Sequence, residues 1–78
     1  LNTSVAHPRE IFRSALLNNG DRILVYHNHP SGNTEPSEAD LIFTKRMEEA
    51  GSVLGIDLLD HIIVSGKEWL SLREYGIL

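Results

Sequence analysis

The sequence predicts an α/β fold of three layers (α/β/α), in which helices cover both faces of a small β-sheet. Two segments carry apolar residues at helical spacing, short β-prone runs follow each of them, and the order along the chain is helix, strand, helix, strand, strand. The 78 residues are enough for one domain, and an apolar share of 41% is typical of a folded chain.

The first helix is expected to begin near Pro8 and to end before Gly20. Proline suits the first helical position, and glycine readily adopts the left-handed conformation that closes a helix. The apolar residues at helical spacing are Ile11, Phe12, Ala15 and Leu16. The run Ile23–Tyr26 then predicts a strand, and because it is apolar on both sides we expect both of its faces to be covered.

A second helix is expected from about Glu38 to near Leu54, after a loop of turn-forming residues at 30–36. Ser37 suits the N-cap position, and Asp40 suits the third helical position of a capping box. The stripe that faces the core is predicted to contain Phe43, Met47, Ala50 and Leu54.

Two further strands are expected after the second helix. Residues 56–64 predict a strand with an irregularity at Asp60–His61. A turn at 65–67 separates it from a short third strand at 68–72. Residues 73–76 predict a closing turn or a short helix.

The composition excludes several classes of protein. The chain has no cysteine, which excludes disulfide scaffolds, thiolate zinc sites and cysteine nucleophiles, and a small chain without disulfides is expected in the cytoplasm. The net charge is −4 and the basic residues are scattered, so direct binding to DNA is not expected. No apolar run approaches the length of a membrane-spanning helix, so we expect no membrane association.

Two histidines and one aspartate form a candidate metal site. His27 and His29 lie two residues apart at the end of a predicted strand, so their side chains leave the same face of the sheet. Asp40 shares a helix face with Met47, where a charged carboxylate needs a positive partner. Three protein ligands leave a fourth position for water, which is typical of a catalytic zinc site.

Each of these residues also has a structural interpretation. A pair of strand-end histidines often binds nothing, and Asp40 could serve as a capping residue alone. His61 is expected to be a hydrogen-bonded structural histidine, with support of the metal ligands as the alternative. His7 is expected to be a helix-entry residue. The acids expected to be solvated at the surface are Glu10, Glu35 and Glu38.

The spacing of the candidate ligands resembles a known signature. From His27 the sequence reads H-N-H-P-S-G-N-T-E-P-S-E-A-D, which is H-x-H, seven residues and S-x-x-D, and this is similar to the JAMM motif of zinc metallohydrolases. The stretches at 1–10, 60–64 and 71–76 also resemble the RadC branch of that family. The resemblance implies the cytidine-deaminase-like fold of a JAMM/MPN domain, of which residues 1–78 are an N-terminally incomplete part.

The resemblance also implies a function. Zinc would be held by His27, His29 and Asp40, and Ser37 would be a catalytic residue that stabilises the oxyanion formed when an amide bond is hydrolysed. N-capping is the alternative role of Ser37, and both roles can hold together. The expected activity is that of a metallopeptidase or isopeptidase acting on a peptide or protein.

One catalytic group of the family is expected outside the sequence. The general base of JAMM enzymes is a glutamate on a segment before the motif, and Glu10 lies downstream of that position. The role of general base is therefore not assigned to Glu10, and residues 1–78 are expected to bind metal yet to hydrolyse little without that glutamate. The alternative function is a catalytically weak or inactive module with a DNA-repair-associated or adaptor role.

Overall fold

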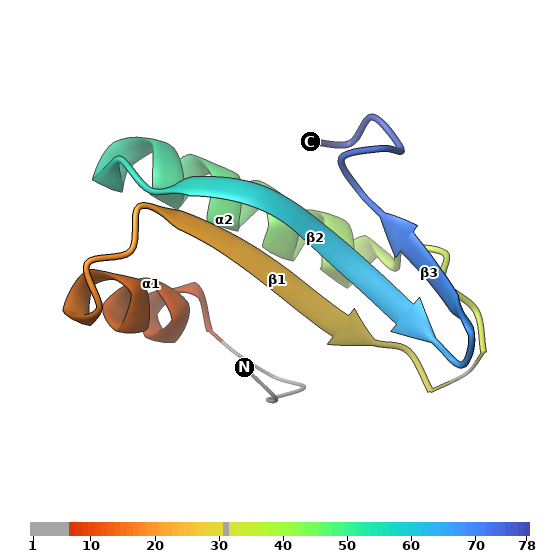
Figure 1. Cartoon of the computed structure of the whole chain (residues 1–78). Coiled ribbons are helices and arrows are strands. Elements are labelled where there is room, and N and C mark those ends of the chain that lie inside the picture. The colour runs from red at the N-terminus through yellow and green to blue at the C-terminus, as the bar shows by residue number, and fades with distance from the viewer. Residues whose placement is uncertain (1–6, 31) are drawn as a thin grey trace.

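The computed structural model describes residues 7–30 and 32–78 of the chain, so the first six residues of the stretch at 1–10 lie outside the described part. The described part contains two helices and three strands, in the predicted order (Figure 1). Their bounds are α1 Pro8–Leu17, β1 Arg22–Asn28, α2 Glu38–Leu54, β2 Asp57–Ser65 and β3 Glu68–Ser71. The predicted α/β class is confirmed. Neither helix combines the length and the apolar character that crossing a membrane requires.

The three strands form one mixed sheet in the order β1-β2-β3. β1 and β2 are parallel, and α2 supplies the crossover connection that parallel neighbours need. β2 and β3 are antiparallel and are joined by a tight turn between Ser65 and Glu68, which pair with each other. Gly66 in that turn has a φ of 59°, a left-handed conformation that glycine adopts without steric cost.

A β-bulge interrupts the pairing of β1 with β2. Ile23 pairs with Leu58, but the next pair joins Leu24 to Asp60, so Leu59 is the extra residue. The sequence predicted an irregularity one position further along the chain. Because the bulge resets the register, the residues of β2 after it keep the alternation that places His61 on the helix side of the sheet.

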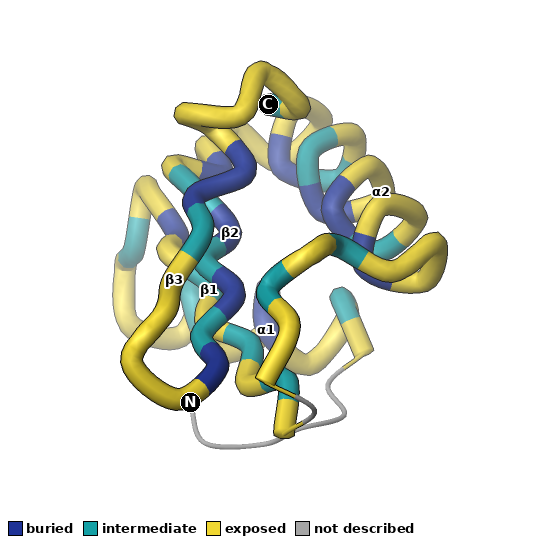
Figure 2. The backbone as a smooth tube through the Cα atoms, turned by 90° about the vertical axis from the view of Figure 1, so that its right-hand side faces the viewer, coloured by how far each residue is buried: buried dark blue, intermediate teal, exposed yellow. Residues whose placement is uncertain are grey.

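Both helices lie on the same side of the sheet and share its core. α1 contacts α2, and Figure 2 shows buried positions of the sheet and of α2 facing one another. The buried apolar cluster consists of Ile11, Phe12, Ile23, Met47, Ile56 and Leu58. Gly51 permits the close turn from α2 into β2, because a Cβ there would lie 2.1 Å from the carbonyl oxygen of Ile56.

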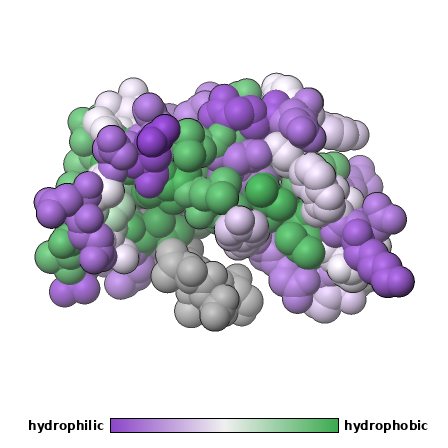
Figure 3. Space-filling model, in the orientation of Figure 1, coloured by the Kyte–Doolittle hydropathy of each residue, from purple (hydrophilic) through white to green (hydrophobic). Residues whose placement is uncertain are grey.

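The other face of the sheet is open among the described residues. Leu24 and Tyr26 of β1 are 44% and 59% exposed, and Trp69 of β3 is 60% exposed. Figure 3 views the molecule from this side and shows hydrophobic residues across its middle. The prediction that both faces of Ile23–Tyr26 are covered is therefore wrong for the described part of the chain, which supplies two of the three predicted layers. An apolar run does not by itself say what covers each face.

The buried stripe of α2 differs from the predicted one. Met47 is fully buried and Phe43 and Ala50 pack at the edge of the core, but Leu54 is 46% exposed. The helix is turned so that polar and small residues lie inward. The buried residues are Asp40, Thr44, Met47 and Gly51. A pattern of apolar residues does not reveal this stripe. Burial of a threonine depends on a hydrogen-bond partner, and hydropathy says nothing about such partners.

Candidate metal centre

The end of β1 presents two imidazole rings on the helix side of the sheet. His27 lies in β1, and His29 follows the last strand residue, but the backbone of His29 is still held by β2. Its N–H donates to the carbonyl of Val64 at 2.8 Å, and the hydroxyl of Ser65 donates to its carbonyl oxygen. The strand geometry therefore extends far enough for the two rings to leave the same face.

The start of α2 brings a carboxylate to the same place. The Asp40 N–H donates to Ser37 Oγ at 3.1 Å, and the Ser37 N–H donates to Asp40 Oδ2 at 2.8 Å. This is the predicted capping box, and it is confirmed. The reciprocal bonds fix both the first turn of the helix and the direction of the Asp40 carboxylate.

The three predicted ligands meet at that carboxylate. His27 Nδ1 lies 2.7 Å from Asp40 Oδ1, and His29 Nε2 lies 2.9 Å from Asp40 Oδ2. The two ring centroids are 4.7 Å apart and the rings are nearly perpendicular, at 85°. Asp40 is only 4% exposed, so its charge is shielded from water and depends on these partners. The structure thus brings the three side chains together, while their role as metal ligands stays a prediction.

The environment of Asp40 favours its charged form. Burial by itself would raise the pKa of this carboxyl group. The backbone and side-chain hydrogen bonds to Ser37 and the neighbouring rings of His27 and His29 act in the other direction and lower the pKa below its usual value. The carboxylate is therefore available as an anionic ligand at neutral pH.

The hydrogen bonds of His29 leave its inner nitrogen suited to a metal. Its Nδ1 lies 3.0 Å from the carbonyl oxygen of Asn33, and because a carbonyl can only accept, Nδ1 carries a proton. In the neutral ring, Nε2 then has a lone pair that faces Asp40 Oδ2. Two lone pairs at this distance need a positive charge between them, either a proton or a metal ion. Fixing one ring nitrogen through a carbonyl is typical of histidine ligands.

His61 of β2 and Thr44 of α2 lie beside the candidate ligands. His61 Nδ1 is 2.6 Å from Thr44 Oγ1, and the His61 ring stacks at 5.9 Å on the ring of His27. Burial lowers the pKa of His61, and this effect outweighs the opposing charges of Asp40 and Asp60. His61 Nε2 is a buried atom without a hydrogen-bond partner among the described residues. His27, Asp40 and His61 each offer a ligand atom within 4.8 Å of the others.

The donor set fits a zinc-like ion. Imidazole nitrogens and a carboxylate oxygen are ligands that zinc accepts, and the cluster contains no thiolate that would favour a softer metal. The unpartnered nitrogen of His61 indicates that the local hydrogen bonding is incomplete without a further group.

Other sequence predictions concern residues around this cluster. Ser37 is exposed at the start of α2 and contacts Asp40 through the capping box, while its catalytic role stays a prediction. His7 is the N-cap of α1 and accepts from the Arg9 N–H at 3.1 Å, which confirms it as a helix-entry residue. The three acids predicted at the surface, Glu10, Glu35 and Glu38, are all exposed.

Sequence reasoning missed Thr44 and did not find the place of His61. Thr44 follows Asp40 by four residues, a spacing that puts both on one helix face and could have indicated it. His61 pairs with Val25, two residues before His27, so the two rings share one face of the sheet. That pairing depends on the register between β1 and β2, which the sequence does not display.

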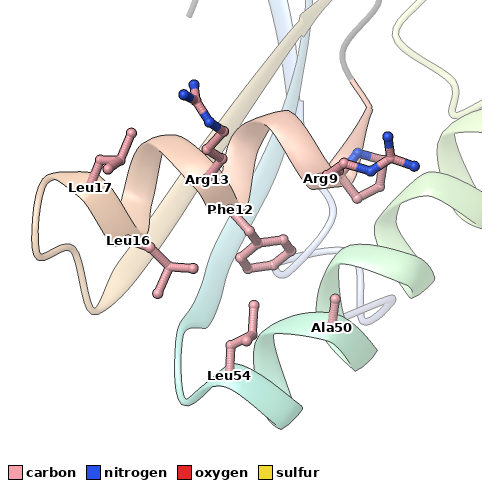
Figure 4. A pocket seen from close by; sticks show the side chains of 8 residues that line it. Arg9, Phe12, Arg13, Leu16, Leu17, Ala50 and Leu54 are labelled. Carbon is pink, nitrogen blue, oxygen red and sulfur yellow. The ribbon is translucent and has the colours of Figure 1, made fainter.

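An apolar groove lies between the two helices, away from the cluster around Asp40. It has a volume of about 510 Å³, and Figure 4 shows Phe12 and Leu16 of α1 approaching Leu54 of α2 across it. Arg9 and Arg13 lie along its rim. The described residues that line it include no acid, imidazole or hydroxyl group.

The chain is similar to one family along nearly its whole length. The family model described as the RadC-like JAB domain matches residues 1–77. This chain belongs to the RadC family. The motif that begins at His27 thus lies within a RadC-like JAB domain, and the predicted resemblance to the RadC family is confirmed.

Relatives of this RadC-family chain occur in several bacteria. It is 61% identical over 74 residues to a UPF0758 protein of Enterococcus faecalis, covering 95% of this chain and 32% of the relative. It is 53% identical over 76 residues to a UPF0758 protein of Listeria welshimeri, covering 97% of this chain and 34% of the relative. A UPF0758 protein of Chlorobium chlorochromatii is 51% identical over 78 residues, covering 100% of this chain and 35% of the relative. The chain therefore spans about a third of the length of the relatives it matches.

Proposed function

We propose that this RadC-like domain is a zinc-dependent hydrolase of amide bonds, with His27, His29 and Asp40 as the metal ligands. The observation that carries the proposal is the convergence of two imidazole nitrogens on the two oxygens of one buried carboxylate, at 2.7 and 2.9 Å. The spacing of these residues, which is that of the JAMM motif, supports the same assignment.

In this proposal the metal would activate water and substrate, and the residues of the chain would hold the metal in place. A zinc ion held by these ligands would lower the pKa of a water molecule and polarise the carbonyl of a substrate. His27 and His29 each present a ring nitrogen to the site, and Asp40 supplies a carboxylate whose direction the Ser37 backbone fixes. This arrangement holds the donor atoms in place before any substrate arrives, which lowers the cost of reorganisation.

Ser37 is proposed to stabilise the oxyanion. Its Oγ accepts from the Asp40 N–H, which uses a lone pair of the hydroxyl and not its proton. The proton can therefore be donated to the oxygen on which negative charge develops during attack on an amide. The capping bond holds Oγ in position for this, so the structural and catalytic roles of Ser37 support one another.

The proposed substrate is a peptide or protein in the cytoplasm. Ser37 is exposed, and the side chain of His27 is 29% exposed, so the cluster can be reached from solvent. Hydrolysis of an extended chain needs such an open site. The proposal assigns the general base to none of the described residues.

Metal analysis tests the binding part of the proposal. After purification without chelators, the chain is expected to hold about one zinc per molecule, the stoichiometry of a three-ligand catalytic site. His27→Ala and His29→Ala should each abolish binding. His7→Ala is the matched control, because His7 is exposed at the start of α1 and caps that helix through the Arg9 N–H. Equal loss in all three variants would point to adventitious binding at histidines.

Hydrolysis tests the catalytic part. The full-length Enterococcus faecalis relative, loaded with zinc, is expected to cleave a member of a panel of peptide and isopeptide substrates. Replacing the serine equivalent to Ser37 with alanine should lower kcat by about 10²–10³-fold, as for other oxyanion donors, and should leave the bound zinc in place. A zinc-loaded protein that cleaves nothing on the panel would favour the non-catalytic module instead.

A further inference from the structure

A buried connection links β2 to the first turn of α2, and the proposed ligand set does not include it. His61 and Thr44 are 1% and 2% exposed. His61 Nδ1 lies 2.6 Å from Thr44 Oγ1, and Thr44 Oγ1 lies 2.8 Å from the backbone carbonyl oxygen of Asp40. The contact joins residues 17 apart in the sequence, so it depends on how α2 docks against the sheet.

The direction of these hydrogen bonds follows from which groups can donate. The carbonyl oxygen of Asp40 only accepts, so the single hydroxyl proton of Thr44 is used there. Nδ1 of His61 must then carry a proton and donate it to Thr44 Oγ1. The chain of donors runs from the imidazole through the hydroxyl to the backbone of Asp40. His61 is thereby fixed as the Nδ1-protonated tautomer, with a lone pair on Nε2.

The same lone pair raises the possibility of direct ligation, which the ring geometry disfavours. The rings of His61 and His27 are stacked, with an angle of 26° between their planes. A nitrogen lone pair lies in the plane of its own ring, so the His61 lone pair runs roughly parallel to the His27 ring. The contact that reaches Asp40 is the one through Nδ1 and Thr44.

We propose that His61 is a positioning residue, which acts through Thr44 to hold the backbone of Asp40 and so to aim its carboxylate at the metal. The capping box holds Asp40 from the N-terminal side, and the His61–Thr44 pair holds it from the sheet side. Together they tie β2 to the turn that carries the anionic ligand. This inference rests on the proposed metal site, because its effect is measured as metal affinity. Residues that support a metal ligand in this way typically contribute about 10-fold to 100-fold in metal affinity.

Substitution of Thr44 tests the hydroxyl. Thr44→Val keeps the shape of the side chain and removes the hydroxyl, and Thr44→Ser keeps the hydroxyl. In a titration with Co²⁺ followed by its visible absorption, we expect Thr44→Val to weaken binding by about 10-fold or more and to change the band intensities. Thr44→Ser should restore most of the affinity. Equal affinities in the two variants, when both fold, would overturn the proposal.

Substitution of His61 separates positioning from ligation. The amide nitrogen of asparagine can replace Nδ1, whereas the amide of glutamine reaches the place of Nε2. We expect His61→Asn to bind Co²⁺ more tightly than His61→Gln and with the spectrum of the unaltered chain. The reverse order, with a changed spectrum in His61→Asn, would make His61 a ligand and would overturn the positioning role.

The remaining measurements keep the two proposals distinct. An unaltered chain that takes up no Co²⁺ or Zn²⁺ would remove the metal site itself. The tautomer of His61 can be read without metal from ring nitrogen shifts in long-range ¹H–¹⁵N spectra, where Nδ1 is expected to be the protonated nitrogen. Protonation at Nε2 would overturn the donor chain even if the metal site holds. Thermal unfolding of each metal-free variant shows whether a loss of affinity merely reflects a loss of folding.

Discussion

Asp40 and Asp60 are two carboxylates on opposite faces of the same small sheet. Asp40 lies on the helix side, and Asp60 lies on the open side, where it pairs with Leu24. Burial alone would raise the pKa of each, yet hydrogen bonds and nearby charges lower both. Their partners nevertheless differ in kind. Asp40 is met by two imidazole rings, while Asp60 is met by backbone N–H groups, a hydroxyl and the charge of Arg73.

The difference shows what makes a buried carboxylate available to a metal. The N–H groups of His61 and Arg73 donate to Asp60 Oδ1 at 2.7 and 3.0 Å, and the hydroxyl of Ser71 donates to Oδ2. A backbone N–H has no lone pair to offer a metal, and the Ser71 hydroxyl directs its proton to the carboxylate, so this set stabilises the charge of Asp60 by hydrogen bonds. An imidazole nitrogen without a proton has a lone pair that can bind a metal. The partners of Asp40 can therefore share a cation with its carboxylate.

The largest expected effect separates the two aspartates directly. Asp40→Asn should weaken binding of Co²⁺ by at least about 100-fold, because a ligand should contribute more than a supporting residue does. Asp60→Asn should leave the affinity unchanged within error, although it also removes one carboxylate charge from the chain. Titration of the two variants under identical conditions gives the answer. Similar losses in both would mean that net charge, and not ligation, controls the affinity.

The next effect concerns the cation that faces Asp60. The Arg73 side chain donates to the carbonyl of Leu58 at 2.9 Å and to that of Leu59, the extra residue of the bulge. Arg73→Met should lower the free energy of unfolding by about 1–3 kcal/mol, because these acceptors lose a charged donor. Urea unfolding measures the loss. Arg13→Met on the exposed side of α1 is the matched control, with an expected change within about 0.5 kcal/mol.

Two serines extend the comparison, since each contacts one of the aspartates. Ser71→Ala removes the donor to Asp60 and should cost about 1 kcal/mol of unfolding free energy. Ser37→Ala removes the N-cap of α2 and should cost about 0.5–2 kcal/mol. Neither change should release bound metal, and only Ser37→Ala should also lower kcat for amide hydrolysis. A loss of affinity in Ser71→Ala would show that the open face of the sheet communicates with the site.

The smallest effect is the dependence of stability on pH. The folded pKa of Asp60 lies below its ordinary value of 3.8, so its contribution is present above that value and is lost as the pH falls through the folded pKa. Stability measured by urea unfolding from about pH 5 to about pH 2 should fall, and Asp60→Asn should make this acid limb shallower. An unchanged slope would show that the partners of Asp60 bind its neutral form equally well.

Local patterns predicted most of the elements and much of the candidate site. The capping box of Ser37 and Asp40, the N-cap His7 and the paired rings of His27 and His29 all follow from spacings of four residues or fewer. Over such distances the backbone conformation alone fixes which side chains face one another. The bulge was predicted one position late, because its place depends on the partner strand.

The tertiary structure decided the features that depend on docking. The rotation of α2 replaced Leu54 with Thr44 in the buried stripe, and the register of β1 against β2 put His61 beside His27. It also left Tyr26 exposed on a face that the sequence predicted to be covered. The order of residues therefore determined that two imidazoles and one carboxylate could meet, since each is fixed by its own strand or helix. Which hydroxyl and which third ring lie beside them was decided only when the helix packed on the sheet, because packing sets contacts between residues far apart in the chain.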